Sequence, residues 1–473
     1  MVRFGKNSAT TLKTVALSLV LATIFAGCSG TGTGHKEYDK EMHSGHYLKA
    51  ATVVETEKDV DTELDDAHLL ATVKAGNGYL YAKDYPRSVS MLDEAENIIK
   101  YHREQILAGD AADTLAKILI NDAAVDYHAS LTDSIMLNTY KSIDYMILGD
   151  NAKARVELNR AIDRQRRAKE TYAELIGKQQ EAIAKETEGD DGSAKAKSMN
   201  NPELKNIVKQ NYSNLDGFQA YPDFVNPFTT YLAGLFFAIE GDYTKSADLL
   251  KEAHGMAPEN KTLEADFQMV ENALNGTPVT EHYVWVIYEN GLGPRKKEFK
   301  INIPLWLVTD KVVYAGIALP RMLDGEQATP DLEVYSNNKM LSRTEIVADL
   351  DRVIYTEFNY TYDDIVARAV LSAITKTYAQ YAAKEYGGQY GGYASLAIGL
   401  FAAATTAADT RMWSSLPTDF QVTRVKMPEN RTLQLKAGTH KINVELGKNA
   451  KHSIVYVRIP TTMSMPSYSV ANF

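Results

Sequence analysis

The residue with the most distinctive chemistry is Cys28, the only cysteine in a chain of 473 residues. Its thiol has no second cysteine with which to form a disulfide. It follows a cationic start and the apolar run 14–26. This order is typical of a signal peptide, and the run is too short for a membrane span of about 20 apolar residues. We therefore predict that residues 1–27 are removed and that the Cys28 thiol is acylated with fatty acids.

The residues Phe25-Ala26-Gly27-Cys28 resemble the lipobox of bacterial lipoproteins, in which small residues precede the lipidated cysteine. The match departs at Phe25, where leucine is usual. The resemblance implies a new N-terminus at Cys28, and Ser29 in place of aspartate implies sorting to the outer membrane. Because two or more acyl chains hold a protein firmly, we expect a lipid anchor in the outer membrane, with the body facing the periplasm.

No other set of residues has the spacing of a catalytic or metal site. The sequence has no HExxH, GxSxG, Walker or CxxC motif. His43 and His46 with Glu41 have the chemistry of metal ligands, but we expect them in a flexible polar segment without supporting residues. The net charge of -10 gives no basic field for nucleic acid. We expect no enzyme, no metal, no cofactor and no nucleic-acid partner.

The elements that would position these groups divide the chain into four parts. Residues 1–27 are the signal peptide and residues 28–60 a lipidated tether that leads into the first helix. Residues 61–277 have an almost wholly helical pattern, and residues 278–473 have the alternation typical of strands. The sequence therefore predicts an α+β chain with a helical half followed by a β half.

Residues 227–258 resemble a tetratricopeptide repeat. Gly234 and Phe237 match the small and aromatic positions of its first helix, Gly241-Asp242 matches the turn, and Ala253 matches the second helix. Two weaker copies lie at 76–95 and 145–161. Since each helix pair buries its face only against its neighbours, we expect an irregular solenoid.

Tetratricopeptide repeats bind partners on the inner face of their first helices, and this resemblance implies a concave partner-binding surface here. The candidate residues for this surface are Asn77, Tyr81, Thr139, Ile143, Tyr231 and Leu235.

The β half alternates apolar and polar residues between turn clusters. It predicts an antiparallel, sandwich-like domain. The expected strands are at 282–288, 297–303, 312–319, 332–335, 345–353, 419–426, 432–435, 440–446 and 453–459.

A helical hairpin is expected within the β half, at 363–409. Its second helix, 393–408, carries no charge. It is short for a membrane span and only weakly lipophilic, which favours burial against the sheet. Insertion of 388–408 into a membrane or a partner is the alternative.

Two passages, 285–298 with 317–320 and 408–417, are similar to a family of bacterial lipoproteins that pair a tetratricopeptide-like helical half with a C-terminal β half. The gene neighbourhoods of this family contain lipoproteins that resemble activators of penicillin-binding proteins, which implies a role in envelope assembly. Within the second passage, Asp409, Arg411 and Trp413 are either a structural corner or a binding contact, and we favour the corner.

Together these patterns predict a protein-binding scaffold in cell-envelope assembly or maintenance, with an envelope protein as its partner. Two alternatives stay open. The chain could insert its apolar hairpin into a membrane or assemble a pore, or it could bind peptidoglycan or another glycan through some of its 28 tyrosines and 3 tryptophans.

Overall fold

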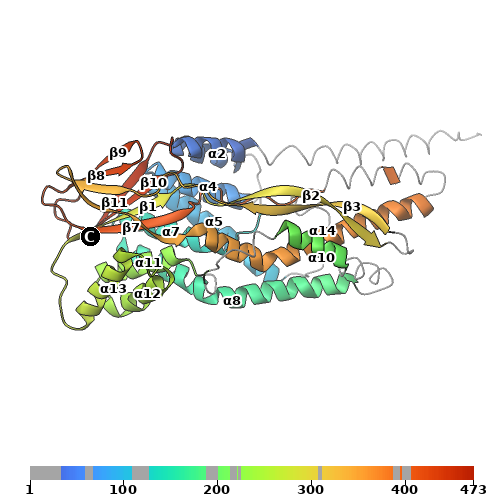
Figure 1. Cartoon of the computed structure of the whole chain (residues 1–473), viewed down its shortest axis with the longest axis horizontal. Coiled ribbons are helices and arrows are strands. Elements are labelled where there is room, and N and C mark those ends of the chain that lie inside the picture. The colour runs from blue at the N-terminus through green and yellow to red at the C-terminus, as the bar shows by residue number, and fades with distance from the viewer. Residues whose placement is uncertain are drawn as a thin grey trace, which may run out of the picture.

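The computed structural model describes residues 33–58, 68–108, 127–187, 201–212, 221, 225–306, 312–386, 395–396 and 406–473. These residues form a layer of helix pairs, a five-stranded sheet and a four-stranded sheet, and an arm that projects beyond them (Figure 1). The predicted lipidation site Cys28, its leader and most of the apolar run 393–408 lie outside the described residues.

The described part of the predicted tether, residues 33–58, is helical. It forms α2 (Thr33–Ser44) and α3 (Tyr47–Lys58). The apolar side chains that it adds to the main core are Tyr38, Met42, Tyr47, Ala50, Ala51 and Val54. The prediction of a tether over 28–60 is therefore wrong for these residues. Histidines and charges between the apolar positions hid spacings of three and four residues, which place one face of each helix in the core.

Three helix pairs make up the repeat layer. They are α4 (His68–Tyr81) with α5 (Tyr85–Ala108), α7 (Leu131–Ile147) with α8 (Asn151–Thr187), and α11 (Pro227–Ile239) with α12 (Tyr243–Met256). The short helix α10 (Pro202–Asn211) precedes the last pair and α13 (Lys261–Leu274) follows it.

The same backbone turn joins the two helices of each pair. In the last pair the Asp242 N–H donates to the Phe237 carbonyl (2.8 Å) and the Gly241 N–H to the Ala238 carbonyl (3.1 Å). This is a Schellman cap, with Gly241 at φ +80°. The first two pairs repeat both hydrogen bonds, with Lys83 and Gly149 in the left-handed position.

Small residues allow the helices of a pair to pack closely. A Cβ added to Gly234 would lie 2.9 Å from the Leu250 side chain, and one added to Gly76 would lie 2.8 Å from Leu92. The structure thus gives Gly76 and Gly234 the role that the repeat pattern predicts.

The five-stranded sheet has the order β11-β10-β1-β7-β6, and the four-stranded sheet has the order β5-β4-β8-β9. The strands are β1 (Tyr283–Asn290), β4 (Glu333–Ser336), β5 (Lys339–Arg343), β6 (Glu345–Asp349), β7 (Asp419–Lys426), β8 (Thr432–Ala437), β9 (His440–Glu445), β10 (Ser453–Ile459) and β11 (Ser467–Asn472). The expectation of a wholly antiparallel domain is wrong at one place, because β1 and β10 run parallel.

The central strand β1 separates two cores. Its residues Val284, Val286 and Tyr288 share an apolar cluster with strands of the four-stranded sheet. Trp285 and Ile287 point the other way, into the core that contains the repeat helices. The five-stranded sheet is therefore covered on both faces.

The arm consists of the hairpin β2 (Arg295–Trp306) and β3 (Val312–Leu323), the helix α14 (Leu350–Tyr386), α10 and the end of α8 (Figure 1). It has an apolar cluster of its own, which includes Tyr212, Ile303, Leu319 and Phe358.

Helix α14 begins at residue 350, so the expected strand 345–353 ends early and the expected helix start at 363 is too late. Asp349 begins the helix by accepting a hydrogen bond from the Arg352 N–H. The β-branched and aromatic residues of 350–362 resemble a strand in composition, but they pack with helical spacing.

The close approach of α11 and α12 gives a first prediction. Gly234→Ala should lower the free energy of unfolding by about 1–3 kcal/mol, because the new methyl group would overlap Leu250. Gly255→Ala in α12 is the matched control, since a Cβ there meets no atom within 4 Å. Denaturant unfolding of both variants measures the difference, and equal stabilities would contradict this account of the packing.

Candidate functional site

The six residues expected on an open concave surface are all buried. Asn77, Tyr81, Thr139, Ile143, Tyr231 and Leu235 are at most 3 % exposed. The chain's own five-stranded sheet covers the inner faces of α4, α7 and α11, with Trp285 and Ile287 in the same core. The prediction that these six side chains offer a free surface to a partner is therefore wrong.

A buried carboxylate marks the centre of this helix–sheet interface. Glu289, on β1, accepts hydrogen bonds from the hydroxyl groups of Tyr81 on α4, Tyr140 on α7 (2.7 Å) and Tyr456 on β10. The Arg458 Nε lies 3.7 Å from the carboxylate, and both side chains are fully buried. Four elements, two strands and two helices, thus meet at one charged group.

The terminal nitrogens of Arg458 form hydrogen bonds with backbone carbonyl groups. Its guanidinium donates to the carbonyls of Gly291 (2.6 Å) and Ser415 (3.0 Å). Burial raises the pKa of Glu289, while Arg458 and the three tyrosine hydroxyls act in the opposite direction. The three tyrosine hydroxyls and the terminal nitrogens of Arg458 donate within the chain, whereas the Arg458 Nε is held near Glu289 by charge alone. The cluster thus joins the helical half to the sheet.

A second buried carboxylate, Asp266 on α13, also accepts hydrogen bonds from side chains of several other elements. It accepts hydrogen bonds from Trp285 Nε1 (3.0 Å), the Tyr231 hydroxyl (2.8 Å) and Arg424 (2.7 Å). The predicted contact residue Tyr231 is thus used to join α11 to α13 and the sheet.

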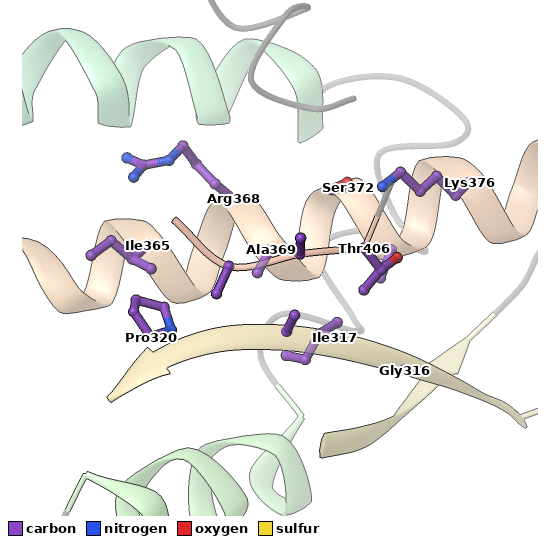
Figure 2. Close-up of a pocket in the computed structure, with 13 residues that line it drawn as sticks. Gly316, Ile317, Pro320, Ile365, Arg368, Ala369, Ser372, Lys376 and Thr406 are labelled. Atoms are coloured by element: carbon purple, nitrogen blue, oxygen red, sulfur yellow. The ribbon is translucent and has the colours of Figure 1, made fainter. Parts of the chain in front are cut away.

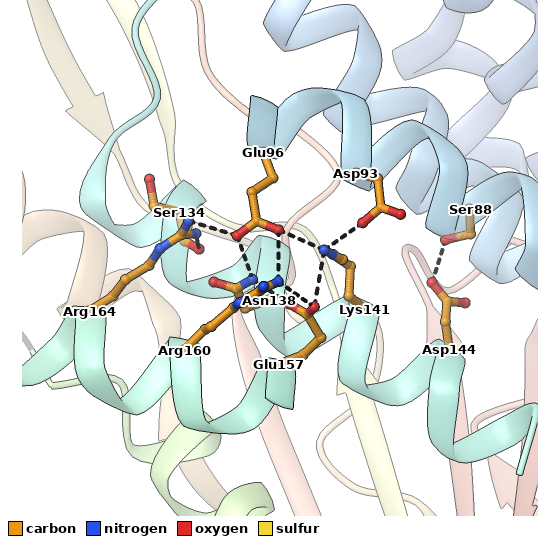
Figure 3. A network of polar contacts seen from close by, with 10 residues as sticks. All are labelled: Ser88, Asp93, Glu96, Ser134, Asn138, Lys141, Asp144, Glu157, Arg160 and Arg164. Carbon is orange, nitrogen blue, oxygen red and sulfur yellow. Dashed lines mark hydrogen bonds and ion pairs between the residues drawn. The ribbon is translucent and has the colours of Figure 1, made fainter. Parts of the chain in front are cut away.

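A third polar cluster ties α5 to α7 and α8, as Figure 3 shows. The buried Lys141 Nζ contacts Asp93 (2.6 Å), Glu96 (2.7 Å) and Glu157 (3.2 Å). One buried cation with three carboxylates fixes the packing of neighbouring helix pairs.

The Glu289 cluster gives a second prediction. Tyr140→Phe should lower the free energy of unfolding by about 1–3 kcal/mol, because it leaves a buried carboxylate with one donor fewer. Tyr243→Phe removes a hydroxyl from a partly exposed tyrosine in the same helical layer and is the control. If both variants unfold at the same denaturant concentration, the hydroxyls do not hold the interface.

Asp409, Arg411 and Trp413 form a structural corner, as favoured from the sequence. The Arg411 Nε donates to the Asp409 carboxylate (2.9 Å), and Trp413 is buried with its ring centroid 5.6 Å from that of Tyr140. These residues connect the arm to the body.

The two histidines considered as metal ligands lie on and just after α2. His46 Nδ1 is 2.7 Å from Glu41, which also pairs with Lys49. Among the described residues no group of three or more potential ligands could hold a metal ion.

Several carboxylates gather where β6 and β7 meet the start of α14. Burial, reinforced by the charges of Asp349 and Asp324, raises the pKa of Asp351 to about 7. Burial likewise raises the pKa of Asp419 to about 6, although Gln327 and neighbouring amides donate to it. Both groups bind protons more tightly in the folded chain than in the unfolded chain.

This cluster gives a third prediction, about pH. A carboxyl group with a raised pKa in the folded state favours folding most at low pH, and this stability is lost as the pH rises from about 4 to about 7. Asp351→Asn should make the free energy of unfolding fall less between pH 4 and pH 7. The difference from the parent should be on the order of 2 kcal/mol at pH 7. Urea unfolding of parent and variant across this range measures it, with Asp363→Asn on the exposed side of the same helix as control. Parallel pH profiles for parent and Asp351→Asn would contradict the prediction.

A small cavity lies in the arm between β3, α14 and residues 406–408 (Figure 2). Ile317, Pro320, Ile365 and Ala369 give it an apolar wall, and Arg368 points away from β3. The polar lining residues Arg368, Ser372, Lys376 and Thr406 each have an interaction within the protein. The cavity is therefore part of the packing of the arm.

In the part of the chain that the structure describes, no helix is both long and apolar enough to cross a membrane. The candidate insertion segment 388–408 lies almost entirely outside that part.

Sequence reasoning did not identify Glu289, Arg458, Asp266 or Lys141. The signal for the first two was present: a single charge within the apolar strands VWVIYEN and SIVYVRI. A charged residue that is buried in such a strand is almost always paired with an opposite charge.

No family model matches the chain, and no curated protein matches it. Among solved structures, one described as MamA AMB-1 is 12% identical with a TM-score of 0.27, over 52% of this chain and 82% of that one. YrrB, described as a TPR protein with an unusual peptide-binding site, is 13% identical with a TM-score of 0.22, over 52% and 92%. These superpositions are loose.

Proposed function

We propose that the chain is a lipid-anchored, protein-binding scaffold of the bacterial outer membrane, with a role in envelope assembly or maintenance. Cys28 carries the anchor, and the chain performs no chemical reaction. The partner is an envelope protein that binds the arm, since the inner face of the repeat helices is closed by the chain's own sheet.

The observation that carries the proposal is the arm. It extends beyond the layered body and has a separate apolar cluster (Figure 1). Its helix α14 has 37 residues, which corresponds to about 55 Å. Its first residues, Leu350 and Val353, pack in the main core of the body, and the rest of the helix extends beyond that core. Contact with another molecule would account for this extra length.

The position of α2 supports an anchor near the base of the arm. Five residue steps separate Cys28 from Thr33, at most about 18 Å of chain. His35, in the first turn of α2, is within the electrostatic reach of Arg411, and the adjacent Met412 contacts the first residues of β2. A lipid on Cys28 would hold the base of the hairpin close to the membrane.

A fourth prediction tests this function in cells. A photoreactive residue in place of the exposed Ala379 on α14 should cross-link to an envelope protein, and the same residue in place of Lys251 on α12 should not. Cys28→Ala should release the chain from the membrane fraction and remove the Ala379 product.

Two outcomes would contradict the proposal. Cross-linking from Lys251 alone would locate binding on the body rather than the arm. Unchanged membrane association of the Cys28→Ala chain would show that the thiol is not the anchor.

A further inference from the structure

The hairpin of the arm has an open edge. Among the residues that the structure describes, β2 and β3 pair only with each other. Their even-numbered residues direct backbone groups outward, because the Lys296 N–H donates to Met412 Sδ (3.3 Å) and the Pro320 carbonyl accepts from the Tyr212 hydroxyl (2.7 Å). Pro304, also even-numbered, has no N–H to contribute to the ladder.

The two ends of the outer edge of β2 differ. At the base, residues 408–412 of the same chain cover it, with the Ala408 N–H donating to Glu298 (2.9 Å). Further along, Lys300 and Asn302 are exposed, and no described residue accepts a hydrogen bond from their backbone N–H groups. Among the described residues, the edge is therefore contacted at its base, while its backbone N–H groups at Lys300 and Asn302 are open to a further strand.

Cationic side chains gather along this edge. Four of the first six residues of β2 are cationic, namely Arg295, Lys296, Lys297 and Lys300. Arg295 pairs with Glu326 (3.0 Å) and Lys300 with Glu298 (3.4 Å). Lys297 lies directly opposite Arg321 on β3, and both are exposed. Like charges placed opposite each other destabilise a strand pair, and an anionic group beside them would reverse this cost.

The geometry points to strand addition: the outer edge of β2 binds an extended acidic segment of a partner protein, which becomes a third strand of the hairpin. Backbone groups at Lys300 and Asn302 supply the hydrogen bonds, and the lysines select acidic side chains. A second copy of this chain is a poor occupant, since it would place one cationic β2 beside another. This inference rests on the proposed scaffold function and names the chemistry of its partner.

The test uses the full mature chain in detergent and two synthetic peptides, one of alternating valine and glutamate and one of alternating valine and lysine. The acidic peptide should bind, and the basic one should not. Lys300→Pro removes the outward N–H at a position of the same parity as Pro304, whereas Lys300→Ala keeps that N–H. Binding of the acidic peptide should be about tenfold weaker for Lys300→Pro than for Lys300→Ala, the loss of one backbone hydrogen bond.

Charge is tested separately with Lys297→Glu, which faces Arg321 and so should not weaken the hairpin itself. It should also reduce binding of the acidic peptide. Circular dichroism of each variant confirms that the fold is kept.

Equal affinities of Lys300→Pro and Lys300→Ala would overturn strand addition. Binding to phosphatidylglycerol vesicles that Lys297→Glu abolishes and Lys300→Pro leaves unchanged would overturn the peptide in favour of a lipid surface. Self-association lost in Lys300→Pro would identify a second copy as the occupant instead. An Ala379 cross-link that persists in Lys300→Pro would leave the scaffold function standing and overturn only the role of this edge.

Discussion

The ion pair between Glu289 and Arg458 is the constraint on which the arrangement of the chain depends. Two charges removed completely from water are costly unless their hydrogen bonds are satisfied. The donors come from α4, α7 and β10, in the form of Tyr81, Tyr140 and Tyr456. No displacement of the helices against the sheet keeps all these contacts, so the pair selects one relative position of the two halves.

The clusters around Asp266 and Lys141 extend this principle across the molecule. Asp266 joins α13 to the sheet, and Lys141 joins successive helix pairs. Apolar packing alone tolerates small shifts between layers, whereas a buried charge with several fixed partners does not. The body is therefore a rigid base. In the function that we propose, recognition is left to the arm, whose hairpin has outward backbone groups without a partner among the described residues.

Local features of the fold were predictable from the sequence, and features that depend on distant partners were not. Gly234, Gly241 and Phe237 act within one helix pair, so their spacing identified the repeat. The strands of the β half were also placed well, apart from β5, β11 and the start of α14. The prediction of an open partner-binding surface failed because Asn77 and Tyr81 face a sheet whose strands come about two hundred or more residues later in the sequence. Nothing in the repeat pattern shows that this sheet covers the inner faces of the helices.

The parallel pairing of β1 with β10 has a consequence for how the chain is made. Val284 pairs with Ser453, so the central strand completes its pairing only once one of the last segments of the chain is present. Until then the grooved faces of α4, α7 and α11 are uncovered, with tyrosines and apolar side chains open to water. Contacts between such distant segments form slowly, and exposed apolar surface promotes aggregation. The incomplete chain is therefore a natural client for holdase chaperones until its last strands are in place.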